Sequence, residues 1–231
     1  MTVLYEDNHI IIVNKEPGEI VQGDKTGDTP LVDTLKEWIK EKYSKPGNVF
    51  CGVVHRLDRP VGGVVVFAKT SKALARLNEM FRLGQVRKTY IAITRNRPAD
   101  DEKRLTGYLK SIERNNKSYI YPVPRDGAKP VALSYRYMGS SDRYHLLEIH
   151  LETGRKHQIR VQLASIGCPI KGDLKYGDKR NNPDGSVSLR AHRIEFDHPV
   201  SGKHIDITAP LPADDTLWQA FSAIIDKDQE A

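Results

Sequence analysis

The sequence is poor in cysteine and contains no long hydrophobic segment. Cys51 and Cys168 are its only cysteines, and neither belongs to a CxxC pair. Two thiols cannot form a disulfide framework, so a small secreted scaffold is excluded. No apolar run approaches the ~20 residues that cross a bilayer, and residues 1–15 lack the features of a secretory signal. These absences indicate a protein of a reducing cytoplasm that has no membrane partner.

Short motifs for nucleotide cofactors, serine nucleophiles and metals are also missing. The chain has no GxxxxGK(S/T) phosphate loop, no GxGxxG after its first strand, no GxSxG and no HExxH. Its eight histidines are scattered, without the spacing of a Cys/His metal site. A metal site can be assembled only from dispersed residues, so we expect neither a metal nor a cofactor. Those dispersed residues are His55, Asp58, His192, Asp197 and His198.

Charge is what the sequence has in excess. Lys and Arg number 36 against 30 Asp and Glu, a formal net charge of +6, and 39% hydrophobic residues are enough to form a core in 231 residues. The excess is concentrated in residues 154–180, which hold seven basic and two acidic side chains. Such a block is typical of a surface that faces a polyanion, and on composition alone it also fits a solvated loop region.

Strand patterns outnumber helix patterns and show no alternation of strand and helix. Gly63–Lys69 is apolar on both faces, which predicts a central buried strand. The pattern predicts an α+β fold: one domain over residues 1–231, with a large mixed, mostly antiparallel sheet and peripheral helices. The other predicted strands are Val3–Glu6, His9–Asn14, Thr89–Thr94, Leu105–Lys110, Ser118–Val123, Val131–Met138, Tyr144–Leu151, Leu189–Phe196 and His204–Thr208. The predicted helices are Leu31–Tyr43, Lys72–Leu83 capped by Ser71, Gln158–Ile166, and one after Asp214 or Asp215.

The segment HRLDRPVGG, residues 55–63, precedes the predicted buried strand. It places the Asp58 carboxylate between two arginines on a loop shaped by Gly and Pro. Guanidinium charge favours an ionised carboxylate, which makes Asp58 a candidate nucleophile or base. The structural alternative is that Asp58 pairs with Arg56 or Arg59 only to fix the turn.

A second segment, TGRKHQIRV at residues 153–161, lies where a strand leads into a helix. Helix N-termini attract anions, and three basic side chains together with His157 add to that field: Arg155, Lys156 and Arg160. Arg160 lies beside the apolar face of the predicted helix, so we expect it to be half-buried and to need a carboxylate partner. Asp58 is the partner we expect. A helix with a solvated basic first turn is the alternative.

These two segments resemble motifs of the RluA family of pseudouridine synthases. HRLDRPVGGVVVFAK (55–69) is similar to the family's catalytic motif, HRLDxxTSGLLLFAK, and TGRKHQIRVQLASIGCPIKGDLKYG (153–177) to its long C-terminal motif. YEDNHIIIVNKEPG (5–18), VRKTYIA (86–92) and LRAHRIEFDHPVSG (189–202) resemble its opening segment, its lysine-tyrosine strand and its closing strand pair. The matches follow the family's order from residue 5 to residue 202.

The resemblance implies an isomerase that converts a uridine of RNA to pseudouridine, with a sheet and peripheral helices around a central active-site cleft. Asp58 would be the catalytic aspartate, Arg56 would occupy the place of the displaced base, and Tyr90 would pack against the uracil. Arg160 would pair with Asp58, while His55 and Leu57 would shape the loop. Basic side chains would hold RNA phosphates: Arg155, Lys156, Arg87, Lys88, and also Arg82, Arg95 and Arg97.

The sequence departs from the family pattern at two points. Val61-Gly62 stands where the family has Thr-Ser, which removes two hydroxyls that could fix the loop. The chain also begins directly with the opening segment, so we expect no separate RNA-binding domain and a short stem-loop of transfer or ribosomal RNA as substrate. A monomer is expected. Two other functions remain: a non-catalytic RNA-binding protein on the same fold, and a metal-dependent nuclease.

Overall fold

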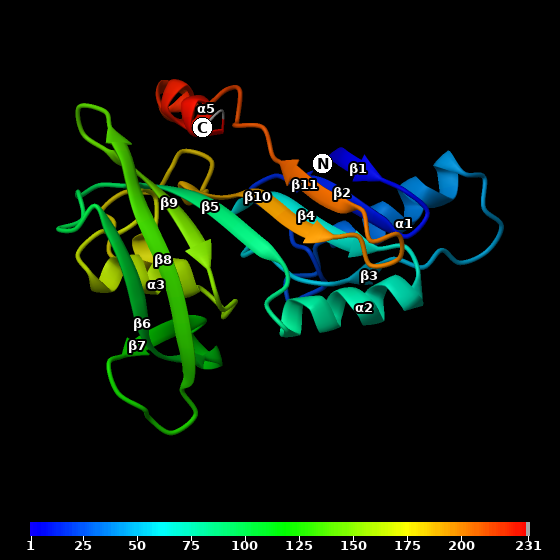
Figure 1. The fold of residues 1–231 in the computed structure, drawn as a ribbon, viewed down its shortest axis with the longest axis horizontal. Helices are drawn as coiled ribbons and strands as arrows, with labels where there is room; N and C mark the ends of the chain where they lie inside the picture. Colours follow the sequence, from blue (N-terminus) through cyan, green and yellow to red (C-terminus); the bar gives the residue numbers. More distant parts are fainter. Residues whose placement is uncertain (230–231) are drawn as a thin grey trace. The chain divides into compact units, whose positions relative to one another are not determined.

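The computed structural model describes residues 1–229, and the chain divides into two compact units (Figure 1). Unit 1 contains Met1–Lys88 and Ala191–Ala209, and unit 2 contains Thr89–Arg190 and the residues from Pro210 onward. The predicted α+β class with mostly antiparallel strands is confirmed. The prediction of one domain over residues 1–231 stays a prediction. None of the helices within residues 1–229 is both long enough and apolar enough to span a membrane.

Unit 1 is built on a sheet whose strand order is β1-β2-β4-β10, with β3 beside β4 and β11 beside β10. The β1/β2, β2/β4, β3/β4 and β10/β11 pairs are antiparallel. Two helices, α1 (Leu31–Lys42) and α2 (Ser71–Arg82), complete the unit. Its strands are β1 (Thr2–Glu6), β2 (Ile10–Lys15), β3 (Gly52–Val53), β4 (Gly62–Ala68), β10 (Leu189–Asp197, in this unit from residue 191) and β11 (His204–Thr208).

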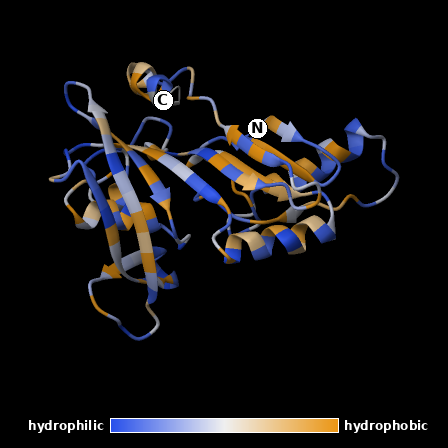
Figure 2. Cartoon of the chain, viewed as in Figure 1, coloured by the Kyte–Doolittle hydropathy of each residue, from blue (hydrophilic) through white to orange (hydrophobic). Residues whose placement is uncertain are grey.

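The core of unit 1 follows from the alternation of side chains along its two central strands. Ile10 and Ile12 on β2, with Val64 and Val66 on β4, pack against the apolar stripe of α2. Figure 2 shows hydrophobic and hydrophilic residues alternating along α2, as expected for a helix with one buried face. Every residue of β2 and β4 is buried, including those that point to the opposite face, which confirms the expected central buried strand.

Unit 2 contains five antiparallel strands in the order β5-β9-β8-β6-β7. Helix α3 (Gln158–Ser165) contributes Val161 and Ala164 to a cluster with Leu109, Ile120 and Val131 of the sheet. The strands are β5 (Arg87–Thr94, in this unit from residue 89), β6 (Glu102–Ile112), β7 (Lys117–Tyr121), β8 (Lys129–Ser140) and β9 (His145–Leu151). Two 3-10 turns, η1 (Glu113–Asn115) and η2 (Leu174–Tyr176), and two C-terminal helices, α4 (Thr216–Ala220) and α5 (Ser222–Gln229), complete the unit.

Two helix ends differ from the sequence prediction. Thr70, not Ser71, caps α2, because its hydroxyl accepts a hydrogen bond from the Ala73 amide at 3.1 Å. Asp215 caps the C-terminal helix as expected, but that helix is broken at Phe221 into α4 and α5. Phe221 is fully buried in a cluster with Ile91, Ile93 and Trp218, so packing on the sheet fixes the chain where the break occurs.

Gly63 is a backbone constraint within unit 1. It is the second residue of β4, pairs with Lys15 and has a φ of +116°, a value that residues with a side chain rarely adopt. A Cβ atom built at this position would lie 2.1 Å from the carbonyl oxygen of Ala191 on the neighbouring strand. The close approach of two backbones therefore requires glycine here.

We expect Gly63→Ala to lower the free energy of unfolding by about 3 kcal/mol or more, through backbone strain and the clash with Ala191. Urea denaturation followed by circular dichroism measures this change. Gly23→Ala is the matched control, because no atom lies within 4 Å of its added Cβ. A Gly63→Ala protein as stable as the control would contradict this account.

Candidate active site

The loop that carries Asp58 begins at a histidine anchored in the core of unit 1. The Nε2 atom of His55 accepts a hydrogen bond from the Val66 amide at 3.0 Å, and its ring stacks on Phe81 with centroids 4.9 Å apart. Burial, with a smaller effect of the Lys88 charge, lowers the pKa of His55 to about 3. The ring is therefore neutral at physiological pH and joins the loop to β4 and α2, in agreement with its expected part in shaping the loop.

A buried lysine that the sequence analysis did not single out holds the other end of this loop. Lys15, at the end of β2, is fully buried. Its Nζ donates to the carbonyl oxygens of Glu16 (3.0 Å), Arg59 (3.1 Å) and Val61 (2.8 Å). The loop itself turns through a hydrogen bond from the Val61 amide to the Asp58 carbonyl at 3.0 Å. One ammonium group thus fixes the backbone on which Asp58 sits.

The pKa of Lys15 reports the same arrangement. Burial lowers it to about 8, against the opposing charges of Glu19, Asp58 and Glu16. Asp58 is thus close enough for its charge to act on the buried ammonium. The sequence does hold a signal for this role, because Lys15 is the one charged residue of the strand IIIVNK, whose other residues are apolar except for Asn14.

The side chains of residues 56–61 differ in how far they are exposed to solvent. Arg56 is exposed, Leu57 is buried and Asp58 is half-buried. Arg59 is exposed and binds Asp28 and Thr26, so it has its own carboxylate partner. Val61 is buried, and the loop is held through its backbone groups, so the missing family hydroxyls are not needed to form this turn.

The predicted RNA-contacting side chains on β5 differ in their surroundings. Arg87 is exposed and lies 3.7 Å from Glu195. Lys88 is half-buried, with its Nζ 5.8 Å from the centre of the Phe81 ring, and burial lowers its pKa. Tyr90 is buried in the middle of the strand, opposite Ile149 of β9.

Arg160 is buried in the first turn of α3 and forms a bidentate ion pair with Asp173. The Nε and NH2 atoms donate to the two Asp173 carboxylate oxygens at 2.7 and 2.8 Å, and the guanidinium lies over the Tyr176 ring at 5.2 Å. The sequence predicts a half-buried Arg160 with Asp58 as its carboxylate partner, whereas the structure buries Arg160 and pairs it with Asp173. The pairing of Arg160 with Asp58 stays a prediction.

The junction before α3 is more ordered than a solvated basic turn. His157 is buried with a φ of +56°, and its Nδ1 lies 2.8 Å from the Tyr176 hydroxyl. The Gln158 side chain accepts from Thr153 and from the Arg155 amide at 2.8 and 3.1 Å. Arg155 and Lys156 are exposed on this fixed backbone, whereas His157 and Arg160 are buried.

Three further basic residues predicted to hold phosphates are already bound to carboxylates. Arg82 pairs with Glu79, Arg95 with Asp178 and Arg97 with Asp101. Within residues 1–229, no three His, Cys, Asp or Glu side chains form a group that could hold a metal.

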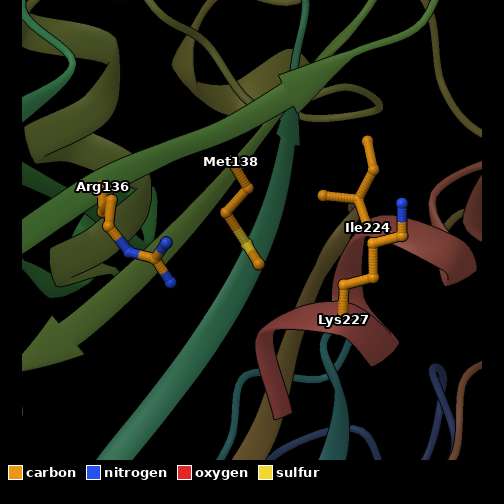
Figure 3. Close-up of a pocket in the computed structure, with 4 residues that line it drawn as sticks. All are labelled: Arg136, Met138, Ile224 and Lys227. Atoms are coloured by element: carbon orange, nitrogen blue, oxygen red, sulfur yellow. The ribbon is translucent and has the colours of Figure 1, made fainter. Parts of the chain in front are cut away.

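A cavity of about 320 Å³ lies in unit 2, and none of the residues predicted for the site lines it. Figure 3 shows Arg136 and Met138 on β8 and Ile224 and Lys227 on α5 around it. Arg136 is bound to Glu148 at 3.1 Å, so its charge is already neutralised there. The cavity therefore contributes nothing to the candidate active site.

We expect Lys15→Met to lower the free energy of unfolding by about 2–4 kcal/mol, since three carbonyl groups, that of Val61 buried, lose their donor. Chemical denaturation measures the loss. Lys36→Met is the control, because Lys36 is half-exposed and pairs only with Asp33 on the surface of α1. Equal stability of the two variants would refute the proposed role of Lys15.

A pH dependence follows from His55. Its pKa is near 3 in the folded protein and 6.5 as a free side chain, so between these values the unfolded chain binds more protons. The stabilisation is complete above pH 6.5 and is lost as the pH falls toward 3, by up to about 1.4 kcal/mol per pH unit. His55→Gln keeps an acceptor for the Val66 amide but does not titrate, so its unfolding free energy should fall less steeply over this range. A difference that does not depend on pH would contradict this assignment.

Comparison with known proteins identifies the family. The sequence model of the RNA pseudouridylate synthase family matches residues 9–165, a stretch that extends over both units. The chain is 33% identical to the ribosomal large subunit pseudouridine synthase D of Xanthomonas campestris, over 97% of this chain and 69% of that protein. It is 31% identical to the tRNA pseudouridine synthase C of Salmonella typhimurium, over 96% of this chain and 89% of that protein.

A solved structure supports the same fold. Human RNA pseudouridylate synthase domain containing 4 superposes with a TM-score of 0.76 at 24% sequence identity, covering 92% of this chain and 89% of that one. The match over residues 9–165 includes the loop of Asp58 and the first turn of α3. On the family model and these relatives together, the chain belongs to the RNA pseudouridylate synthase family, whose members are isomerases.

Proposed function

We propose that this chain isomerises a uridine of a structured RNA to pseudouridine and that Asp58 is the catalytic carboxylate. The observation that carries this proposal is the fixed turn of residues 58–61. Its backbone is hydrogen-bonded to the buried Lys15, which leaves the half-buried Asp58 side chain on a rigid support. A single catalytic domain over residues 1–231 is part of the proposal, as are a monomeric state and a place in the cytoplasm.

The reaction needs few groups. The bond between N1 of uracil and C1′ of the sugar breaks, the base rotates, and C5 bonds to C1′. The proton on C5 leaves and N1 gains one, so atoms and electrons balance without an oxidant or a phosphate donor. Asp58 can attack the sugar, attack the ring, or take a proton from the sugar, and each route needs one carboxylate in a site from which water is excluded.

The other predicted residues complete the proposal. Arg56 is exposed beside Asp58 and would take the place of the flipped base in the RNA. Tyr90 would pack against the uracil, and Arg160, held rigid by Asp173, would orient the Asp58 carboxylate. Arg155, Lys156, Arg87 and Lys88 would contact RNA phosphates, so binding is expected to weaken as salt rises.

The substrate that we propose is a stem-loop of transfer or ribosomal RNA. The relatives are named for both kinds of RNA. A loop suits base flipping because its nucleotides are already partly unstacked, whereas the deep major groove of a regular RNA duplex hides the base edges.

The test maps pseudouridine in total RNA by carbodiimide adducts and primer extension. It compares cells with the intact gene, a deletion, and Asp58→Asn. We expect one or more uridine signals to fall to the background of the deletion in Asp58→Asn, because the amide can serve neither as a nucleophile nor as a base. Asp33→Asn is the matched control, since Asp33 pairs with Lys36 on the surface of α1, and it should retain the signal.

If Asp58→Asn restores the modification, the catalytic assignment is wrong. If transfer and ribosomal RNA from the deletion strain show no change at any uridine while the protein is expressed in the intact strain, isomerisation of those RNAs is refuted. A non-catalytic RNA-binding protein on the same fold would then account better for the chain.

A further inference from the structure

The β6–β7 ribbon of unit 2 has two faces of different chemistry. Its register places Leu109 opposite Ile120 and Ser111 opposite Ser118 on one face. That face is packed: Leu109 and Ile120 belong to the cluster with Val161 and Ala164 of α3. Successive residues of a strand point to opposite faces, so the alternate residues of the ribbon point away from α3.

We define the outer ribbon face as the half-buried residues on that other side together with Arg125, a cation that follows β7. Its cross-strand pairs are Tyr108 with Tyr121, Lys110 with Tyr119, and Ile112 with Lys117. Ile112 is exposed, and the other five residues of these pairs are half-buried. Their aromatic rings and the aliphatic parts of the lysine side chains therefore form a continuous surface. The outer ribbon face consists of Tyr108, Lys110, Lys117, Tyr119, Tyr121 and Arg125.

Cations on this face lie against aromatic rings. The Lys117 Nζ is 5.9 Å from the centre of the Tyr119 ring, and it lies at the edge of the ribbon, since it is also 5.4 Å from the ring of Tyr176 in the inner cluster. The Arg125 guanidinium is 4.6 Å from the centre of the Tyr121 ring. Aromatic rings that alternate with cations are the chemistry that binds single-stranded nucleic acid, because bases stack on the rings and phosphates meet the charges.

The cations of the outer ribbon face differ from several other cations of unit 2, which are paired with carboxylates. Elsewhere in unit 2, Arg104 pairs with Glu152, Arg136 with Glu148, and Lys103 with Asp100. Among the residues that the structure describes, Lys110, Lys117 and Arg125 pair with no carboxylate. Lys110 donates only to the Asp126 carbonyl, at 2.9 Å. Their positive charge is therefore available to an anion from outside the chain.

We propose that the outer ribbon face is a platform on which unpaired nucleotides of the substrate RNA stack, with their phosphates held by Lys110, Lys117 and Arg125. This inference rests on the proposed function and adds to it a second binding surface, outside the catalytic residues, that selects unpaired RNA. The position of β7 as the last strand of its sheet leaves the ribbon without a further strand beside it.

The experiment measures the affinity of the full chain for two probes, a labelled oligouridylate and a blunt RNA duplex. It compares Tyr108→Leu/Tyr121→Leu with Tyr108→Phe/Tyr121→Phe. We expect the Leu pair to raise the Kd for oligouridylate by about tenfold or more, since stacking is lost, and to leave the duplex Kd unchanged. The Phe pair keeps the rings and should bind both probes as the unaltered protein does.

A second pair of variants tests the charges and serves as well if the Leu protein does not fold. Lys110→Gln/Arg125→Gln should reduce the slope of log K against log salt on oligouridylate by about 0.7 for each phosphate that the variant no longer neutralises. Arg104→Gln is the control on the same strand, because Arg104 already pairs with Glu152. Its slope should not change.

The outcomes distinguish this platform from the catalytic proposal. Equal oligouridylate affinities of a folded Leu variant and the unaltered protein, or an unchanged salt slope in the Gln variant, overturn the platform. Either result would favour another occupant for the ribbon, such as a peptide strand added beside β7. Asp58→Asn is expected to bind oligouridylate normally while losing isomerisation, so a platform that fails leaves the assignment of Asp58 standing.

Discussion

The candidate site depends on one buried ammonium group and the carbonyl oxygens around it. Lys15 lies at the end of β2 and donates hydrogen bonds to the backbone carbonyl oxygens of Arg59 and Val61. Because the side chain is buried, water does not compete for these hydrogen bonds. Burying this charge is unfavourable, as its lowered pKa shows, and the cost is offset by three hydrogen bonds and nearby carboxylates. The loop that carries Asp58 begins at His55, whose neutral ring is hydrogen-bonded to the Val66 amide, and ends near Gly63, which pairs with Lys15. The backbone around Asp58 is therefore fixed at both ends of the loop.

In unit 2, the buried Tyr176 side chain connects several elements, as Lys15 does in unit 1. The Tyr176 hydroxyl accepts from the Ser118 amide at 2.7 Å and lies beside His157, while its ring lies under the Arg160 guanidinium. Asp173 locks Arg160 in one orientation. Tyr176 therefore joins β7, the junction before α3, and α3 itself. The inner face of β7 is hydrogen-bonded to Tyr176 through the Ser118 amide, and the opposite face of the same strand belongs to the outer ribbon face. The backbone that supports the outer ribbon face is therefore fixed from its inner side.

Most of the elements could be predicted because their patterns are local. Gly63–Lys69 is apolar on both faces, and the structure buries every residue of β4. The α2 stripe of Ala73 and Leu77 packs on this sheet as its helical spacing indicates. The differences arise where packing competes with local preference. Phe221 breaks the C-terminal helix because its ring is fixed in the core, and Thr70 replaces Ser71 as a cap because its extended backbone places the hydroxyl at the Ala73 amide.

The sequence by itself determined the family, the α+β class and the two segments that carry the chemistry, because motif order and side-chain periodicity are written along the chain. Only the tertiary structure decided which charged groups are engaged. Asp173 pairs with Arg160, Asp28 pairs with Arg59, and Asp178 pairs with Arg95. Lys15, which no sequence motif marks, supports the backbone of the Asp58 loop. Such pairings join residues that are from 13 to 83 positions apart. Their formation depends on burial and on distance in three dimensions, which spacing in the sequence does not encode.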